Sequence, residues 1–279
     1  MRRQALPKGK GSVSTKPRGN LDLRSALAWA LVICLALPGC AGRVRPAPGN
    51  GSPGGFSYQP LPTQPPVALS AASVDKFVYW VLTMKSIQVD DVIKQIALVA
   101  SDNSVVDAVA SRLSFTQPGS VDHQLIYLSV LGQMRNERAL GPLRDYVNST
   151  ACPVNEDLRE TGSVSRASTV LDVCAMLKSH AINMISYINT AAAQEIALQV
   201  VANHPSKSVR ISAIDSFLYN SGDSPEAIQV VSRYVRPEER IFIGLPRLDS
   251  STSLQEFDRR VEQFYRDHPE QLPPSPRKE

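Results

Sequence analysis

The chain has 279 residues, a formal net charge of +4 and a sequence pI near 8.9. The segment 1–40 carries seven basic side chains and one acidic one, so the remainder has a formal charge of −2. The remainder therefore lacks the basic surplus that is typical of nucleic-acid-binding proteins, and we expect no nucleic-acid partner.

The first element is a short apolar run over residues 26–37, which contains no charged residue. As a helix these twelve residues would be about 18 Å long, whereas the hydrocarbon core of a bilayer is about 30 Å thick. The run is too short to span a membrane stably, but it has the length of the apolar centre of an export signal. The basic residues before it and the small residues after it complete the pattern of such a signal.

The run ends in Leu37-Pro38-Gly39-Cys40. This motif resembles the lipobox of bacterial lipoproteins, in which diacylglycerol alkylates the cysteine and the chain is then cut before it. The resemblance implies a signal peptide over residues 1–39, cleavage between Gly39 and Cys40, and palmitate or similar acyl chains on Cys40 as a membrane anchor. Residue 41 is Ala and not Asp, which resembles the default sorting of such lipoproteins to the outer membrane, facing the periplasm. A plain secretory cleavage and a cytosolic chain with a chance apolar helix are the alternatives.

Residues 40–70 form the next segment, and eleven of the 21 residues over 46–66 are Pro or Gly. Such a stretch buries too little apolar surface to offset the entropy lost on ordering. We therefore expect a disordered tether that reaches at most about 60–70 Å when extended. The alternative is a docking motif made by Pro60, Pro62, Pro65 and Pro66.

Apolar residues at helical spacing begin near Ser73, and we expect an all-α domain over residues 71–250 because no long alternating strand pattern is present. Ser73 is expected to cap the first helix, and Asp102 or Ser104 to cap the third. Three faces are predicted to be apolar: Val74, Phe77, Val78 and Val81 on the first helix; Val92, Ile93, Ile96 and Val99 on the second; Val105, Val109 and Leu113 on the third.

Three segments then repeat one plan, over residues 121–147, 181–201 and 209–235. In the first, Leu131-Gly132 closes a helix and Ala139-Leu140 opens another; in the third, Val209-Arg210 opens the unit. The plan resembles the HEAT-like repeat named after the phycobilisome lyases. It implies a short α-solenoid of helix pairs with an extended concave binding surface. An ordinary helical bundle with accidental spacing is the alternative.

The spacing of the repeats also predicts an insertion. Phe217 follows Ile185 by close to one repeat period, whereas the step from Leu131 to Ile185 is much longer. The surplus of about 22 residues over one period fits residues 148–169, where Pro, Gly, Ser and Asp accumulate.

Cys152 and Cys174 bracket the insertion, and an oxidising periplasm permits a disulfide between them. Closing a loop of this size would stabilise the fold by about 3 kcal/mol in the chain-entropy model. Two separate free thiols are the alternative.

No catalytic pattern is evident. His123, His180, His204 and His268 are scattered, and none stands in a metal-binding or protease motif. The acidic residues Glu156, Asp157 and Glu160 cluster in the insertion, where solvation is the simpler interpretation. We therefore expect no enzymatic activity, no cofactor and no metal, and we expect His204, which precedes Pro205, to act as a partner for a helix carboxyl end.

The last segment, residues 251–279, is predicted to be a capping helix followed by a loose tail, with Ser251 or Ser253 as cap. A helix that binds a partner or the membrane surface is the alternative. The complete sequence thus favours a lipid-anchored envelope protein that acts as a non-catalytic scaffold or protein-binding module. Two alternatives remain open: a periplasmic enzyme, and a structural lipoprotein that tethers the membrane to the cell wall.

Overall fold

The computed structural model describes residues 65–84, 88–113, 121–150, 170–247 and 252–271. Every regular element within these ranges is a helix, so the predicted all-α class is confirmed. The predicted signal peptide, most of the tether and the insertion at 151–169 lie outside the described residues.

The α-helices are, in chain order, α2 (Val74–Thr83), α3 (Val89–Leu98), α4 (Asn103–Ala110), α5 (Val121–Gln133), α6 (Leu140–Asn148), α7 (Val170–Ile188), α8 (Ala191–Asn203), α9 (Lys207–Asn220), α10 (Pro225–Val231) and α11 (Leu254–Asp267). Short 3-10 helices join or extend them: η2 (Ser111–Leu113), η3 (Glu137–Ala139), η5 (Pro237–Gly244) and η6 (Pro269–Gln271).

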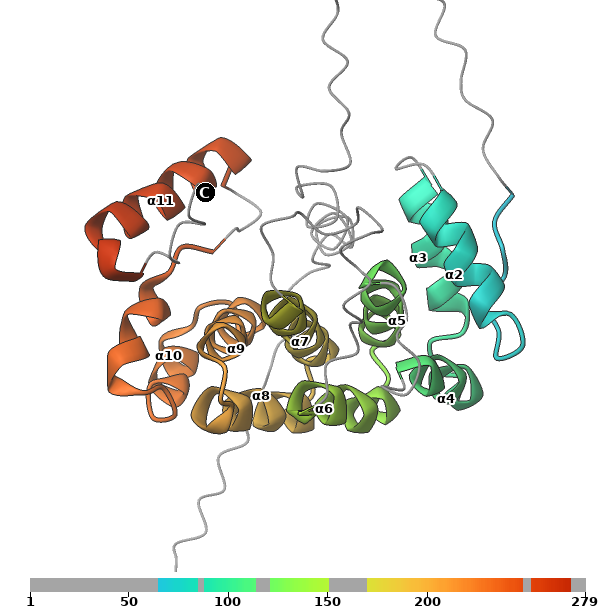
Figure 1. Cartoon of the computed structure of the whole chain (residues 1–279), viewed down its shortest axis with the longest axis horizontal. Coiled ribbons are helices and arrows are strands. Elements are labelled where there is room, and N and C mark those ends of the chain that lie inside the picture. The colour runs from blue at the N-terminus through green and yellow to red at the C-terminus, as the bar shows by residue number, and fades with distance from the viewer. Residues whose placement is uncertain (1–64, 85–87, 114–120, 151–169, 248–251, 272–279) are drawn as a thin grey trace, which may run out of the picture.

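From α5 to α10 the helices form three consecutive pairs in two layers. The first helices of the pairs, α5, α7 and α9, pack side by side, as Figure 1 shows. Of the second helices, α6 and α8 lie in the other layer, where α6 packs against α7 and α8 packs against α7 and α9. The last second helix, α10, packs against α9 at the end of the stack. Stacking pairs in this way buries apolar faces that a single pair would leave exposed.

A recurring N-cap marks the start of the second helical segment in each pair, and also the start of α4. The caps are Asp102, Asn136, Thr190 and Ser224, and each side chain accepts a hydrogen bond from a backbone N–H two or three residues later. The step from Asp102 to Asn136 equals the step from Thr190 to Ser224, whereas the step between Asn136 and Thr190 is longer. The structural period is therefore about 34 residues, a length typical of helix-pair repeats, with about 20 extra residues between the second and third caps.

The same apolar positions follow each cap. The residues 3, 7 and 11 positions after it are all buried. They are Val105, Val109 and Leu113 after the first cap, Ala139, Leu143 and Val147 after the second, Ala193, Ala197 and Val201 after the third, and Ala227, Val231 and Val235 after the fourth. Residues at this spacing share one face of a helix, so the four units bury equivalent faces.

The turn within each of the three pairs is also equivalent. Arg135, Asn189 and Asp223 have positive φ angles of 49°, 55° and 50°, and each directly precedes a cap. A residue in this left-handed conformation ends the first helix and redirects the chain toward the second.

Three details differ from the sequence-based expectations. Ser73 occupies the N-cap position of α2, but its hydroxyl donates to the carbonyl oxygen of Ala68 and does not cap the helix. Leu69 is buried in the core, so the folded part begins before residue 70. The caps repeat at a slightly longer period than Ile185 and Phe217 indicate, because the turn after α9 is longer and includes Gly222.

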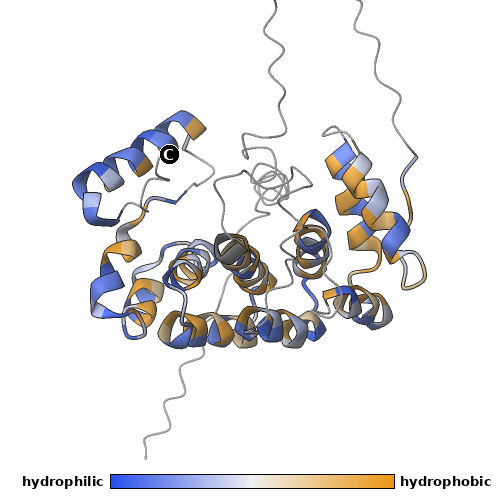
Figure 2. Ribbon diagram, in the orientation of Figure 1, coloured by the Kyte–Doolittle hydropathy of each residue, from blue (hydrophilic) through white to orange (hydrophobic). Residues whose placement is uncertain are grey.

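At the carboxyl end, Ser253 caps α11 by accepting from the N–H of Glu256. Figure 2 shows that α11 is mostly hydrophilic, with few apolar residues. Phe264 attaches it to the stack through the ring of Phe242, at 6.3 Å between centroids, and Lys207 donates to Gln271 just after it.

Candidate functional site

The residues expected to carry lipid and disulfide chemistry are only partly described. Gly39, Cys40 and Cys152 lie outside the described residues, as do Glu156, Asp157 and Glu160. Cys174 lies near the start of α7, where its side chain is buried and disulfide-bonded. Its bonding partner is outside the described part of the chain.

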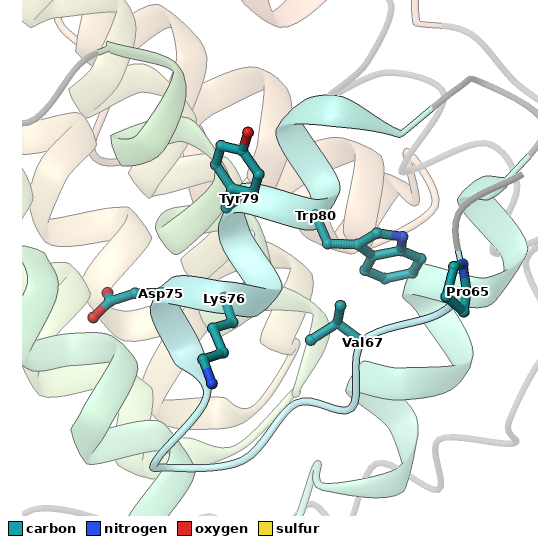
Figure 3. Close-up of a pocket in the computed structure, with 6 residues that line it drawn as sticks. All are labelled: Pro65, Val67, Asp75, Lys76, Tyr79 and Trp80. Atoms are coloured by element: carbon teal, nitrogen blue, oxygen red, sulfur yellow. The ribbon is translucent and has the colours of Figure 1, made fainter.

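A recess of about 540 Å³ lies beside α2, between that helix and the segment that contains Pro65 and Val67 (Figure 3). Trp80 and Val67 lie close together there, and Tyr79 points away from them. The Asp75 carboxylate binds Arg112 through two hydrogen bonds of 2.9 Å. These bonds lower the pKa of Asp75, so it serves as an anionic anchor between α2 and η2. Most of the residues that line the recess, namely Pro65, Val67, Tyr79 and Trp80, are apolar or aromatic, so the recess offers mainly apolar contact surface.

Ser129 of α5 and His180 of α7 form a serine–histidine contact within the described part of the chain. His180 Nε2 lies 2.8 Å from Ser129 Oγ, but the Ser129 hydroxyl donates to the carbonyl oxygen of Leu125. The Ser129 hydroxyl has one proton, which it donates to the Leu125 carbonyl oxygen, so His180 Nε2–H is the donor in the contact with Ser129. The serine proton is therefore directed away from the histidine. Burial lowers the pKa of His180 to about 4. The pair is arranged to join two helices rather than to activate a nucleophile.

His204, at the end of α8, binds the carboxyl end of α6 rather than that of its own helix. Its Nε2–H donates to the carbonyl oxygen of Val147 at 3.1 Å, while Nδ1 accepts from the N–H of Ser206. Burial lowers the pKa of His204, and the charges of Lys178 and Arg210 add to this effect. His204 therefore does bind the carboxyl end of a helix, as expected, but it does so as a neutral imidazole, and the helix is α6 of the preceding unit. Lys178 also donates to the carbonyl oxygen of Ser149, beyond the same helix end.

Arg210 is the residue that ties α8, α9 and η5 together. Its guanidinium forms a buried ion pair with Glu239, in which Nε lies 2.9 Å from Oε2, and both side chains are at most 5% exposed. Nη1 also donates to the carbonyl oxygens of His204 and Pro205. The arginine noted in the Val209-Arg210 motif therefore links consecutive units.

A partly exposed line of polar and aromatic side chains crosses the carboxyl ends of α5, α7 and α9. We call Arg135, Tyr187, Tyr219 and Asp215 the tyrosine stripe. The Arg135 guanidinium lies over the Tyr187 ring, 4.3 Å from its centroid. Burial raises the pKa of Tyr219, and the nearby Tyr187 and Asp215 raise it further. Three consecutive units therefore contribute to one surface.

Arg247 fixes the far end of the tyrosine stripe. This buried side chain makes contacts of 3.0 Å with Asp215 and 2.8 Å with Asp223. Loss of hydration raises the pKa of Asp215, against the effect of Arg247, and Asp223 raises it further. The stripe consequently has an arginine at one end and a carboxylate at the other.

No motif in the sequence predicts the tyrosine stripe. Its members lie at or near the ends of the first helices, outside the motif positions that define the repeats. The Asp215 and Tyr219 pair has four-residue spacing, but only the packing of α7 beside α9 brings Tyr187 to it.

Within the described ranges, no cluster of three or more histidine, cysteine or acidic side chains is suited to a metal ion. The helices of the same ranges include none that is both long and apolar enough to span a bilayer. Comparison of the chain with protein-family models, with curated proteins and with solved structures finds no significant match.

Proposed function

We propose that this protein is a lipid-anchored scaffold of the bacterial cell envelope, which binds a protein partner through its stack of helix pairs. In this proposal Cys40 carries the acyl chains, residues 40–64 form a spacer, and the helix pairs form a short solenoid on the periplasmic side of the outer membrane. The protein does not act as an enzyme.

The observation that carries the binding function is the tyrosine stripe. Tyrosine and arginine are enriched among residues that dominate binding energy at protein interfaces. Here they come from three consecutive units, at or near the carboxyl ends of α5, α7 and α9, and the second helical segments of these units have equivalent caps. A rigid stack that presents such side chains is suited to binding an extended partner surface.

The anchoring function depends on the lipobox resemblance and has a direct test. We expect metabolic labelling with a palmitate analogue to modify the wild-type protein and not Cys40→Ser. Cys34→Ser is the matched control, because Cys34 lies in the same apolar run but outside the motif, and it should remain labelled. Labelling of Cys40→Ser, or recovery of the native protein from the cytosol, contradicts the proposal.

The binding function is tested separately, by site-specific photocrosslinking in intact cells from exposed positions on several helices. We expect one defined envelope protein to be crosslinked, and only from a limited set of positions. Copurification with peptidoglycan and no protein crosslink would instead support the cell-wall tether.

A further inference from the structure

Arg135 at one end of the tyrosine stripe is exposed and has no carboxylate partner within the described residues. Arg138, three residues later, contrasts with it, because the Arg138 guanidinium binds Asp107 through two hydrogen bonds of 2.6 and 2.7 Å. Arg138 is therefore used to join α4 to η3, whereas the five N–H donors of Arg135 remain available.

The Tyr187 ring holds the Arg135 guanidinium in place. A guanidinium stacked over an aromatic ring has a restricted orientation, so it loses less conformational freedom when a partner binds. Carboxylates bind the planar N–H edge of such a group through two parallel hydrogen bonds. The arrangement is thus prepared for an acidic group.

We propose that the tyrosine stripe recognises an acidic side chain of a protein partner, which pairs with Arg135 while the adjoining partner residues pack against Tyr187 and Tyr219. This inference rests on the proposed protein-binding function and specifies the chemistry of the partner.

The charges at the two ends of the tyrosine stripe also determine how the bound partner segment is oriented along it. Asp215 is 44% exposed at the opposite end, and Arg247, its buried partner, also binds Asp223. An acidic side chain placed beside Asp215 would be repelled, whereas one beside Arg135 would be attracted. The partner's acidic residue therefore lies at the α5 end of the stripe, and the rest of its segment extends toward α9.

A glycan strand of the cell wall is the competing ligand, because aromatic rings can also stack on sugars. The guanidinium of Arg135 already covers one face of the Tyr187 ring. Carbohydrate stacking on that face would displace the cation, whereas an acidic side chain would keep it in place. The geometry therefore favours a protein segment.

The test uses the full chain in its native cells, with a photocrosslinking amino acid at Tyr187 or Tyr219. The control position is Gln199, which is exposed on α8 in the other layer. We expect both stripe positions, and not the control, to crosslink one protein. Mass spectrometry of the crosslinked peptide should find an aspartate or glutamate within a few residues of the crosslink.

Charge reversal then tests Arg135 itself. Arg135→Glu should lower the crosslinking yield at least tenfold, and Arg135→Gln should lower it less. Arg233→Glu, at an exposed arginine just after α10, should leave the yield unchanged. Reversal of the partner's acidic residue to lysine should restore crosslinking to Arg135→Glu. The thermal unfolding midpoint of each variant shows that a loss of yield is not a loss of fold.

The inference is wrong if the stripe positions crosslink to glycan, to a segment without an acidic residue, or with a yield that Arg135→Glu does not change. It is also wrong if a protein partner crosslinks only from other helices, an outcome that leaves the proposed scaffold function intact. If no protein crosslinks from any position, the proposed function and this inference both fail.

Discussion

Gly132 of α5 lies directly against Met184 of α7. A Cβ atom on Gly132 would be 2.5 Å from Met184 Sδ and 2.7 Å from Met184 Cβ. The sulfur belongs to a flexible side chain, but the Cβ atom is fixed to the α7 backbone. The approach of these two helices therefore requires glycine, which explains physically why Leu131 is followed by the smallest residue.

Gly132→Ala should force α5 and α7 apart and lower the free energy of unfolding by about 1–3 kcal/mol, as overpacking typically does. Gly141→Ala is the matched control, because nothing lies within 4 Å of its added Cβ. Alanine has the higher helix propensity, so this variant should be neutral or up to about 1 kcal/mol more stable. Urea denaturation measures both changes, and equal effects of the two substitutions would contradict close packing of α5 against α7.

Glu239→Gln should be strongly destabilising, by about 3–5 kcal/mol, because it leaves the buried guanidinium of Arg210 without a counter-charge. Glu238→Gln changes the exposed neighbouring residue in the same way and should leave the urea midpoint unchanged. If Glu239→Gln unfolds at the wild-type midpoint, the buried ion pair does not hold α9 to η5.

His180 predicts a specific pH dependence of stability. Its pKa is about 4 in the folded state and near 6.5 when the chain is unfolded. The unfolded state therefore binds the proton more tightly, so stability is full above about pH 6.5 and is lost as the pH falls toward 4. The loss attributable to this residue is up to about 3 kcal/mol.

His180→Gln isolates that contribution, because glutamine can still donate to Ser129 but does not titrate. Urea denaturation of both proteins between pH 7 and 4 should give a shallower loss for the variant, and carboxylates that titrate in both cancel in the comparison. Parallel curves would show that His180 is not buried in its neutral form.

We predict a disulfide between Cys152 and Cys174. Peptide mapping without reduction should recover the linked pair, and Cys174→Ser should lower the free energy of unfolding by about 3 kcal/mol because the bond closes a loop of about 22 residues. Cys152→Ser and the double variant should match that loss, since all three remove the same bond. Unequal single variants, or recovery of Cys152 as a free thiol, would contradict this pairing.

The sequence by itself determined the helical class and much of the packing. Within each helix, apolar residues recur at helical spacing, as Val105 and Val109 do in α4, and this period alone predicts that they are buried on one face. Leu143 of α6 and Ile185 of α7 are buried in the same way. The sequence also predicts an insertion between α6 and α7, which stays a prediction because residues 151–169 lie outside the described part of the chain.

Only the tertiary structure decided which side chains from different units meet. Arg135 and Tyr187 belong to different helix pairs, and Arg210 and Glu239 lie on different elements, so no local period relates the members of either pair. Their contacts depend on how closely α5, α7 and α9 approach and on the left-handed residues that set each turn. Local backbone and solvation preferences select helices, whereas the placement of polar groups on the stack depends on distances that arise only when the helices pack.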